Sequence, residues 1–448
     1  MMSKSSGMSR LRRLWVTGVA LLALVGCAAS TTGRQSQDEA PALELPQQSL
    51  LTSSMRQQPV SGWTTTVDQL GLPPGTVVRP VGNIGDRGVF LGITDEGWWL
   101  LGVDVTNGQR TFGPTRLGPA GDATDFNCLV NGPPMVLCVR QGPELSVPST
   151  AWVIDTSSGE LTFDGPTDLR VTGPQDQPRL EQIGDYAIAG VTGKGMYGVG
   201  PRGELTWFVP GDGMLSAQFA TWDRDTRLST FAVQGGGGVA DVVFSVVDGK
   251  VVKPSVPQEV QLGQAIVYPK GIGYEYTRTG DFAERVAFFD NTGKKLSEPE
   301  PGGTLETRSV DLPMVGSKSN DRVFALDGRK LLELPASGAP PNARLIGPRF
   351  FVATDADHRV WQQFDLLTGE TGKTCEGDSL GFYYIASDGE VAVALGDGTP
   401  AQGIDLATCG TLWSLPGSAP NEAKEVWKVH TTLVQRTNDR LFSLVSPK

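Results

Sequence analysis

The chain has 448 residues, of which 39% are hydrophobic and only 19% charged, and this balance excludes a mainly disordered protein. Its 57 glycines and 31 prolines are spread without a collagen-like period, which favours many short strands joined by turns. The formal net charge of −11 argues against nucleic acid as a partner, because binding to phosphates requires a basic surface.

The N-terminus has the pattern of a secretion signal. An apolar run of 12 residues, 14–25, follows a positive segment and is too short for a membrane span. Residues 24–27 resemble the lipobox of bacterial lipoproteins, in which the cysteine after the cleavage site receives a diacylglyceryl group; the alternative is an ordinary cleaved signal with an incidental cysteine. We therefore expect residues 1–26 to be a lipoprotein signal peptide and Cys27 to be lipidated. The positive segment contains Lys4, Arg10, Arg12 and Arg13.

A lipidated Cys27 predicts a location on the outer face of the bacterial cytoplasmic membrane. Two or three acyl chains would anchor the protein stably, since burial of each CH₂ contributes about 0.8 kcal/mol. Residues 27–60 are rich in Ser, Thr, Gln and Pro and have no apolar period, so we expect them to form a flexible tether. Removal of residues 1–26 takes away four basic and no acidic residues, which changes the net charge from −11 to −15 and favours basic or neutral partners.

The other four cysteines are an even number in an exported chain, which predicts two disulfides. Cys128 and Cys138 flank a turn sequence, so a hairpin could place them on facing strands. Three pairings are possible in principle; we expect Cys128–Cys138 with Cys375–Cys409, and free buried thiols are the alternative. The sequence has no CxxC pair and only two histidines, so it predicts no zinc or other metal site.

Turn sequences that end in glycine recur along residues 61–448, and most begin with aspartate. Successive turn glycines lie 35 to 51 residues apart, with a mean of about 43, which matches a four-stranded propeller blade. A β-prone segment precedes each turn, and no capped apolar pattern of helical period occurs, so we expect an all-β domain. The turn glycines are Gly108, Gly159, Gly203, Gly249, Gly293, Gly328, Gly369 and Gly410.

The two ends of residues 61–448 are expected to complete one blade together. Residues 426–429, 432–435 and 441–445 supply three strands, and residues 62–67 would add the outer strand and close the ring. The eight turns plus this composite blade give one unit more than an eight-bladed ring. We predict a β-propeller of eight four-stranded antiparallel blades, with seven as the alternative, and suspect that the short interval before Gly328 hides a misassigned turn.

The repeat resembles that of quinoprotein-type, or PQQ-like, β-propellers, whose docking motif is approximately Ala-x-Asp-x-x-Thr-Gly-x-x-x-Trp. Asp365 and Gly369 match its turn. In the last copy, Cys409 reads as an insertion before Gly410 that shortens the spacing to the tryptophan. We interpret the aromatic residues as packing against the next blade, at about 1.5–3 kcal/mol per site, rather than as a ligand platform. The remaining motif residues are Asp104, Gly108, Phe112, Asp155, Gly159, Phe163, Gly203, Trp207, Asp405 and Trp413.

The resemblance implies a non-catalytic platform that binds an envelope protein or another envelope component through the loops of one ring face. In kind it is similar to BamB, the propeller lipoprotein of outer-membrane assembly. We expect no catalytic residues, no cofactor and no nucleic-acid partner, with the membrane contacted through the lipid anchor.

Two enzyme classes are alternatives. A quinoprotein dehydrogenase would hold a quinone and calcium in the ring centre and usually has two adjacent cysteines, which this sequence lacks. A glycosidase-like propeller acting on envelope carbohydrate would need paired carboxylates, and the Asp-to-Gly spacing of four differs from the spacing of two in the sialidase Asp box. The candidate carboxylates are interpreted as solvated turn residues; they are Asp223, Asp225, Asp355 and Asp357.

Overall fold

The computed structural model describes residues 43–448 except 120, 122, 145, 217, 219–224, 239, 301, 336–341, 420 and 421. The chain divides into two compact units, Met1–Leu43 and Glu44–Lys448, and the fold below is that of the second. The expected signal peptide and Cys27 lie outside the described residues, so lipidation stays a prediction. Within the described part of the chain, no helix is long and apolar enough to span a membrane.

The strands form because apolar and β-branched residues are placed where neighbouring blades cover them. In β8 (Ser149–Asp155), four consecutive residues, 151–154, are buried, since this third strand of its sheet is covered on both faces. In β9 (Glu160–Thr167), the outer strand of the same sheet, burial alternates along the sequence. This sheet therefore passes from a fully buried interior to a half-exposed outer edge.

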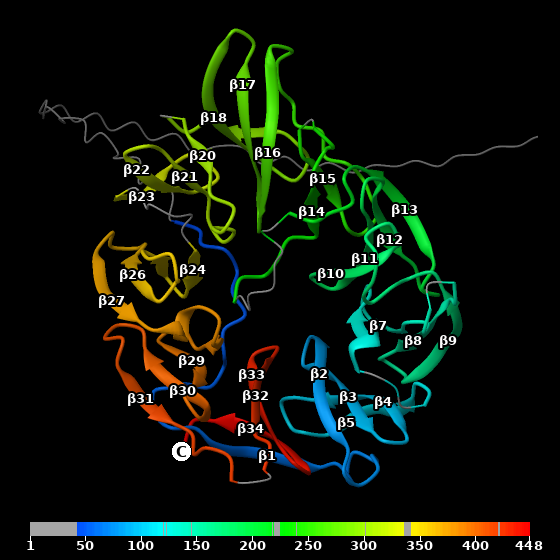
Figure 1. Ribbon diagram of the computed structural model, residues 1–448. Helices are drawn as coiled ribbons and strands as arrows, with labels where there is room; N and C mark the ends of the chain where they lie inside the picture. The colour runs from blue at the N-terminus through cyan, green and yellow to red at the C-terminus, as the bar shows by residue number, and fades with distance from the viewer. Residues whose placement is uncertain are drawn as a thin grey trace, which may run out of the picture. The chain divides into compact units, whose positions relative to one another are not determined.

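The described residues form eight four-stranded antiparallel sheets and one two-stranded sheet, arranged around a ring (Figure 1). We number them as blades along the chain. Blade 1 consists of β2 (Val77–Ile84), β3 (Arg87–Thr94), β4 (Gly97–Asp104) and β5 (Arg110–Arg116), and blade 2 of β6 (Phe126–Val130), β7 (Met135–Arg140), β8 and β9. Blade 3 consists of β10 (Arg179–Ile183), β11 (Tyr186–Val191), β12 (Gly195–Val199) and β13 (Leu205–Pro210), and blade 4 of β14 (Phe231–Gln234) and β15 (Val242–Ser245).

The remaining five blades are all four-stranded. Blade 5 consists of β16 (Val260–Tyr268), β17 (Gly271–Arg278), β18 (Asp281–Phe289) and β19 (Lys295–Ser297), and blade 6 of β20 (Thr304–Leu305), β21 (Met314–Gly316), β22 (Asn320–Phe324) and β23 (Lys330–Pro335). Blade 7 consists of β24 (Ala343–Ile346), β25 (Arg349–Ala353), β26 (Val360–Asp365) and β27 (Thr371–Glu376), and blade 8 of β28 (Tyr384–Ser387), β29 (Val391–Gly396), β30 (Thr399–Asp405) and β31 (Thr411–Ser414). Blade 9 consists of β32 (Glu425–Val429), β33 (Thr432–Thr437), β34 (Arg440–Val445) and the N-terminal strand β1 (Val60–Thr66). Two short 3₁₀ helices, η1 (Ala123–Asp125) and η3 (Asp378–Leu380), precede blades 2 and 8.

The predicted all-β propeller with eight four-stranded blades is confirmed, and the two-stranded blade 4 is a ninth unit. Single bridges, Leu215↔Gln234 and Phe244↔Val251, mark the positions that the first and fourth strands occupy in the other blades. Pro254 and Pro257 follow the outer bridge, and proline cannot donate to a β-ladder. The suspicion about Gly328 was wrong, because that turn joins two strands of the complete blade 6.

Ring closure occurs as predicted. The N-terminal strand β1 pairs with β34 from Val60↔Val445 to Thr66↔Arg440, with a bulge after Ser61. Because β1 completes the sheet of the three C-terminal strands, the two ends of residues 60–445 are held in one blade (Figure 1). This pairing removes the free edge that β34 would otherwise present.

The turn aspartates of the repeat order the chain between the third and fourth strands. In each of four copies the Oδ1 atom accepts the backbone N–H two residues further along, at 2.8 to 2.9 Å. Hydroxyl donors, Thr106 and Ser157, also hold the pKa of two of these carboxyl groups below its ordinary value. These carboxylates are therefore engaged within their own turns. The four are Asp104, Asp155, Asp365 and Asp405.

An aromatic side chain on one outer strand covers the turn glycine of the next blade at three joints. A Cβ atom on these glycines would lie 2.5 to 2.9 Å from the aromatic side chain, and their φ angles are 72° to 78°. Trp63 also donates its Nε1–H to the carbonyl of Val105 at 2.7 Å. Glycine is required there for both conformation and close approach. The pairs are Trp63 with Gly108, Phe112 with Gly159, and Trp207 with Gly249.

The last copy of the turn differs from the prediction at Cys409. Its φ angle is 60°, and its N–H donates to the carbonyl of Asp405 at 2.8 Å, which is the bond that Gly369 makes in its own turn. Cys409 therefore replaces the turn glycine and is not an insertion. Gly410 is outside that left-handed position, and Trp413 stands in register, eight residues after the aspartate.

Both predicted disulfides are confirmed. Cys128 and Cys138 are directly opposite each other on β6 and β7 within blade 2. Cys375, on the outer strand of blade 7, is bonded to Cys409 in the turn of blade 8. The second disulfide thus makes a covalent joint at a position where other blades use glycine.

Candidate functional site: the ring centre

Residues 44–56, which we call the strap, lie against the ring instead of belonging to a flexible tether. Met55 is fully buried and Leu51 is 6% exposed, in one apolar cluster with Val391 and Trp413. Burial of each such side chain contributes about 1.5–3 kcal/mol, which offsets the entropy cost of ordering the segment. The prediction of a flexible tether was therefore wrong for residues 44–60, because two apolar residues in a polar stretch are sufficient to fix it.

The strap follows the ends of three blades on one side of the ring. Three of its hydrogen-bond partners lie at or beside turns between the first and second strands, on what we call the turn face. Gln48 donates to and accepts from the backbone of Gly347, at 2.9 and 2.8 Å. Farther along, Leu51 N–H donates to Ser387 O at 2.8 Å and Thr52 N–H to Thr431 O at 3.1 Å.

A second segment, between β13 and β14, meets the strap inside the ring. We call residues 225–230 of this segment the inner loop. Ser49 N–H donates to Asp225 O at 2.6 Å, Arg227 N–H donates to Gln47 O at 2.9 Å, and Gln48 pairs with Thr226 in an antiparallel bridge. In Figure 1 both segments run through the middle of the ring. The centre is thus crossed by two pieces of the chain itself.

Asp225 is the electrostatic centre of this arrangement. Its carboxylate is 2% exposed and accepts a hydrogen bond from Lys428 Nζ at 2.6 Å and another from the Tyr384 hydroxyl. Arg344 stacks on the Tyr384 ring, with Cζ 3.9 Å from the centroid. Burial first, and the Asp225 charge second, raise the pKa of Tyr384 far above its ordinary value, so the phenol stays protonated and donates.

The interpretation of Asp225 as a solvated turn residue was wrong. Its two charged or polar partners come from the inner strands of blades 8 and 9, 159 and 203 residues away in sequence. Of the other candidate carboxylates, Asp355 accepts the N–H groups of Arg359 and Val360, as expected of a turn residue, and Asp357 is exposed. Asp223 lies outside the described residues.

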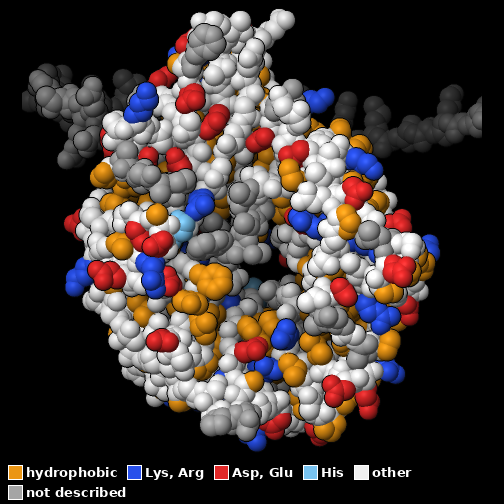
Figure 2. Space-filling view, viewed as in Figure 1, with side chains coloured by type: hydrophobic (Ala, Val, Ile, Leu, Met, Phe, Trp, Pro, Cys, Tyr) orange, Lys and Arg blue, Asp and Glu red, His pale blue; other side chains and the backbone are white. Residues whose placement is uncertain are grey.

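The chemistry available at the centre is limited by these internal pairings. Where the structure describes the chain, no group of three or more His, Cys, Asp or Glu side chains is arranged to hold a metal ion. Lys428 and Tyr384 both bond to Asp225, so the negative charge of this carboxylate is already balanced by a cation of the chain itself. Figure 2 shows charged and hydrophobic side chains bordering the opening of the ring.

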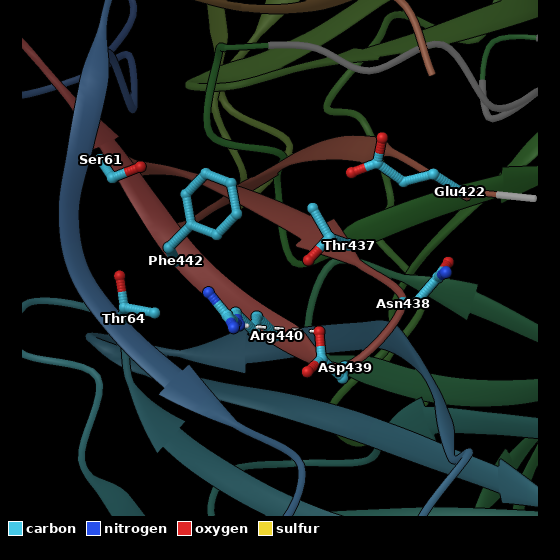
Figure 3. A pocket seen from close by; sticks show the side chains of 8 residues that line it. All are labelled: Ser61, Thr64, Glu422, Thr437, Asn438, Asp439, Arg440 and Phe442. Atoms are coloured by element: carbon cyan, nitrogen blue, oxygen red, sulfur yellow. Dashed lines mark ion pairs between the residues drawn. The ribbon is translucent and has the colours of Figure 1, made fainter. Parts of the chain in front are cut away.

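Among the hollows formed by the described residues, we consider two that lie away from the centre. The first, of about 320 Å³, is at ring closure, where Ser61 and Thr64 of β1 and Phe442 of β34 surround it together with the β33–β34 turn (Figure 3). Arg440 and Asp439 form a loose ion pair at its edge, 3.7 Å apart. The second, of about 540 Å³, lies at the joint between blades 2 and 3.

Sequence reasoning missed the groups that hold the ring centre. Lys428, Tyr384 and Arg344 lie on ordinary inner strands, where their local sequence resembles that of other blades. The strap had one available signal, since Leu51 and Met55 are apolar residues in a polar stretch.

The fold is that of a β-propeller in which the strap and the inner loop pair with each other on the inside of the ring. The chain belongs to the family of conjugation-associated nine-bladed β-propeller domains, whose model matches residues 35–447. The nine sheets described above agree with that description. A protein of Mycolicibacterium smegmatis strain MKD8, described as uncharacterized, is 37% identical over 432 residues, which cover 90% of this chain and 88% of that protein.

Two solved structures are also similar to this chain. The computationally designed Ika8 protein has a TM-score of 0.41 and 13% identity, with 73% of this chain and 98% of that chain covered. BamB from Moraxella catarrhalis has a TM-score of 0.35 and 14% identity, with 87% of this chain and 98% of that chain covered.

Proposed function

We propose that this chain is a lipid-anchored, non-catalytic platform of the bacterial cell envelope, which binds a protein or another envelope component of a conjugation apparatus. The family description supports the link to conjugation. The lipobox pattern at residues 24–27 supports the anchor. Acidity of the chain supports a basic or neutral partner.

The observation that carries the proposal is the occupation of the ring centre. A quinoprotein-type enzyme holds its cofactor there, whereas here the strap and the inner loop cross it and Asp225 is paired with Lys428. A ligand at that place would have to displace a buried ion pair, which costs several kcal/mol unless new partners replace it. The outer loops and joints are the surface left for binding.

The test is capture from membranes. The full chain, carrying a C-terminal affinity tag, is purified after mild crosslinking from cells that contain a conjugative element, and co-purified proteins are identified by mass spectrometry. The proposal expects a specific envelope partner and reduced DNA transfer when the protein is deleted. No specific partner, together with glycoside hydrolysis or quinone-dependent oxidation by the pure protein, would contradict it.

The anchor has a separate test. A Cys27→Ala variant should lose the mass of the lipid and leave the membrane fraction, because one residue carries all the acyl chains. Undiminished membrane retention of Cys27→Ala would refute lipidation as the anchor and leave the binding proposal standing.

A further inference from the structure

The joint between blades 2 and 3 departs from the packing seen at neighbouring joints. By analogy with Phe112 on Gly159, Phe163 should cover Gly203. Instead, a Cβ atom on Gly203 would lie 3.0 Å from the Cβ of Ala151 and 3.6 Å from Thr167 Oγ1. Phe163 is half-buried and packs against the apolar cluster that blades 2 and 3 share, but it does not cover Gly203.

The cause lies in how the chain leaves blade 2. Thr167 Oγ1 donates to the carbonyl of Gly203 at 2.6 Å, so the end of β9 closes the inner part of the joint itself. The Phe163 ring turns toward Gly165 of its own strand, where a Cβ atom would be 2.8 Å from Cζ of the ring. The Phe163 side chain stays partly exposed.

The result is a hollow of about 540 Å³, within the size range of ligand pockets. Apolar side chains from both blades and from the connection between them form half of its lining. The apolar lining residues are Pro148, Phe163, Pro166, Leu169 and Leu205.

Charged groups at the edge of the hollow are free to meet a ligand. Arg202 lies over the Phe163 ring, 5.3 Å from its centroid, and has no ion-pair partner among the described residues. Asp168 is exposed and likewise lacks a hydrogen-bond or ion-pair partner in the described part of the chain. Glu204 accepts the N–H of Arg202 at 2.7 Å, so the lining has two carboxylates, Asp168 and Glu204, and one cation.

We propose that this hollow binds an extended peptide segment of a partner protein in which an apolar side chain is next to a lysine or arginine. The apolar side chain enters between Phe163 and Leu205, the basic side chain pairs with Asp168, and Arg202 donates to peptide carbonyls. The local excess of carboxylates and the net charge of −11 favour a basic segment. This inference deepens the proposed function, and it rests on that function in taking the partner to be a protein.

The probe is a phage-displayed library of random peptides, selected on the full-length protein. Selected sequences should share an apolar residue beside Lys or Arg, and synthetic copies should bind with a Kd that rises at least about tenfold for Asp168→Lys, as expected when a favourable charge pair becomes a repulsive one. Asp95→Lys is the matched control, because Asp95 is also an exposed carboxylate, in the β3–β4 loop of blade 1. Its Kd should equal that of the wild type, and circular dichroism should show both variants folded.

The outcomes separate the two proposals. Selected peptides without a basic residue, an empty selection, or equal binding by Asp168→Lys would overturn the inference about the hollow. If membranes still yield the same partner with Asp168→Lys, the platform stands and the hollow is not its site. If the hollow binds the peptides but membranes yield no partner, the platform fails and the peptide site survives.

Discussion

The ring centre and the joint between blades 2 and 3 use charged residues in opposite ways. At the centre, Asp225 is 2% exposed and bonds to Lys428 and Tyr384 within the chain. At the joint, Arg202 and Asp168 are exposed, and no described carboxylate or cation pairs with them. A desolvated charge must be paired within the fold, whereas an exposed one is stabilised by water until a partner arrives. We therefore propose that the charges at the centre serve stability and that those at the edge serve recognition.

The largest expected effect comes from breaking the central pair. Lys428→Met leaves Asp225 buried without its cation and should lower the free energy of unfolding by about 3–5 kcal/mol. The double variant Lys428→Met with Asp225→Asn should recover much of that loss, since no unpaired charge remains. Chemical denaturation measures both. Equal stability of the single and double variants would show that the pair is not an energetic unit.

Removal of the inter-blade disulfide should cause the next largest loss of stability. It closes a separation of 34 residues, and loop-closure entropy predicts a loss of about 4 kcal/mol for Cys375→Ser with Cys409→Gly. Glycine is chosen at 409 because it accepts the left-handed backbone. The matched control is Cys128→Ser with Cys138→Ser, which opens a separation of 10 residues and should cost about 3 kcal/mol. Chemical denaturation measures both variants, and a larger loss of unfolding free energy for the control than for the inter-blade variant would contradict this order.

Removal of one buried strap side chain should lower the free energy of unfolding by less than either change above. Met55→Ala removes a fully buried side chain and should cost about 2–3 kcal/mol. The measurement is thermal unfolding combined with protease sensitivity of the strap. Ser53→Ala is the control, because it changes a strap side chain outside the apolar cluster and should stay within about 0.5 kcal/mol of the wild type. Equal effects of the two substitutions would mean that the strap is not held by its apolar contacts.

The smallest effect is a pH dependence away from both regions. Burial raises the pKa of Glu306, and the neighbouring charges of Asp321 and Glu275 add to that rise. A carboxyl group with a raised folded-state pKa stabilises the fold at low pH, and this contribution is lost as the pH rises through that pKa. Glu306→Gln should therefore unfold at a higher temperature than the wild type at a pH of about 7.5, with the difference disappearing near a pH of about 4. A constant difference across this range would exclude the titration of Glu306 as its cause.

Much of the architecture follows from local sequence. Turn aspartates, turn glycines and the aromatic residues eight positions after the aspartate predict the third and fourth strands, and the cysteine positions favour the two disulfides that form, among three possible pairings. The interpretation of Cys409 was wrong because sequence spacing cannot show which residue takes the left-handed conformation; only its φ of 60° does.

The candidate sites depend on contacts that sequence spacing does not encode. Asp225 reaches partners 159 and 203 residues away, and the strap meets Gly347 at a separation of 299 residues. At the joint between blades 2 and 3, Thr167 bonds to the carbonyl of Gly203 and Phe163 does not cover that glycine, which is an outcome of side-chain packing and not of the repeat pattern.

The most direct measurement is crosslinked capture from membranes with three proteins in parallel: the wild type, the edge variant Asp168→Lys, and the centre variant Lys428→Met with Asp225→Asn. The account predicts one specific envelope partner for the wild type and the centre variant, with recovery reduced for Asp168→Lys. Loss of the partner in the folded centre variant alone, or catalytic turnover without any partner, would contradict the account.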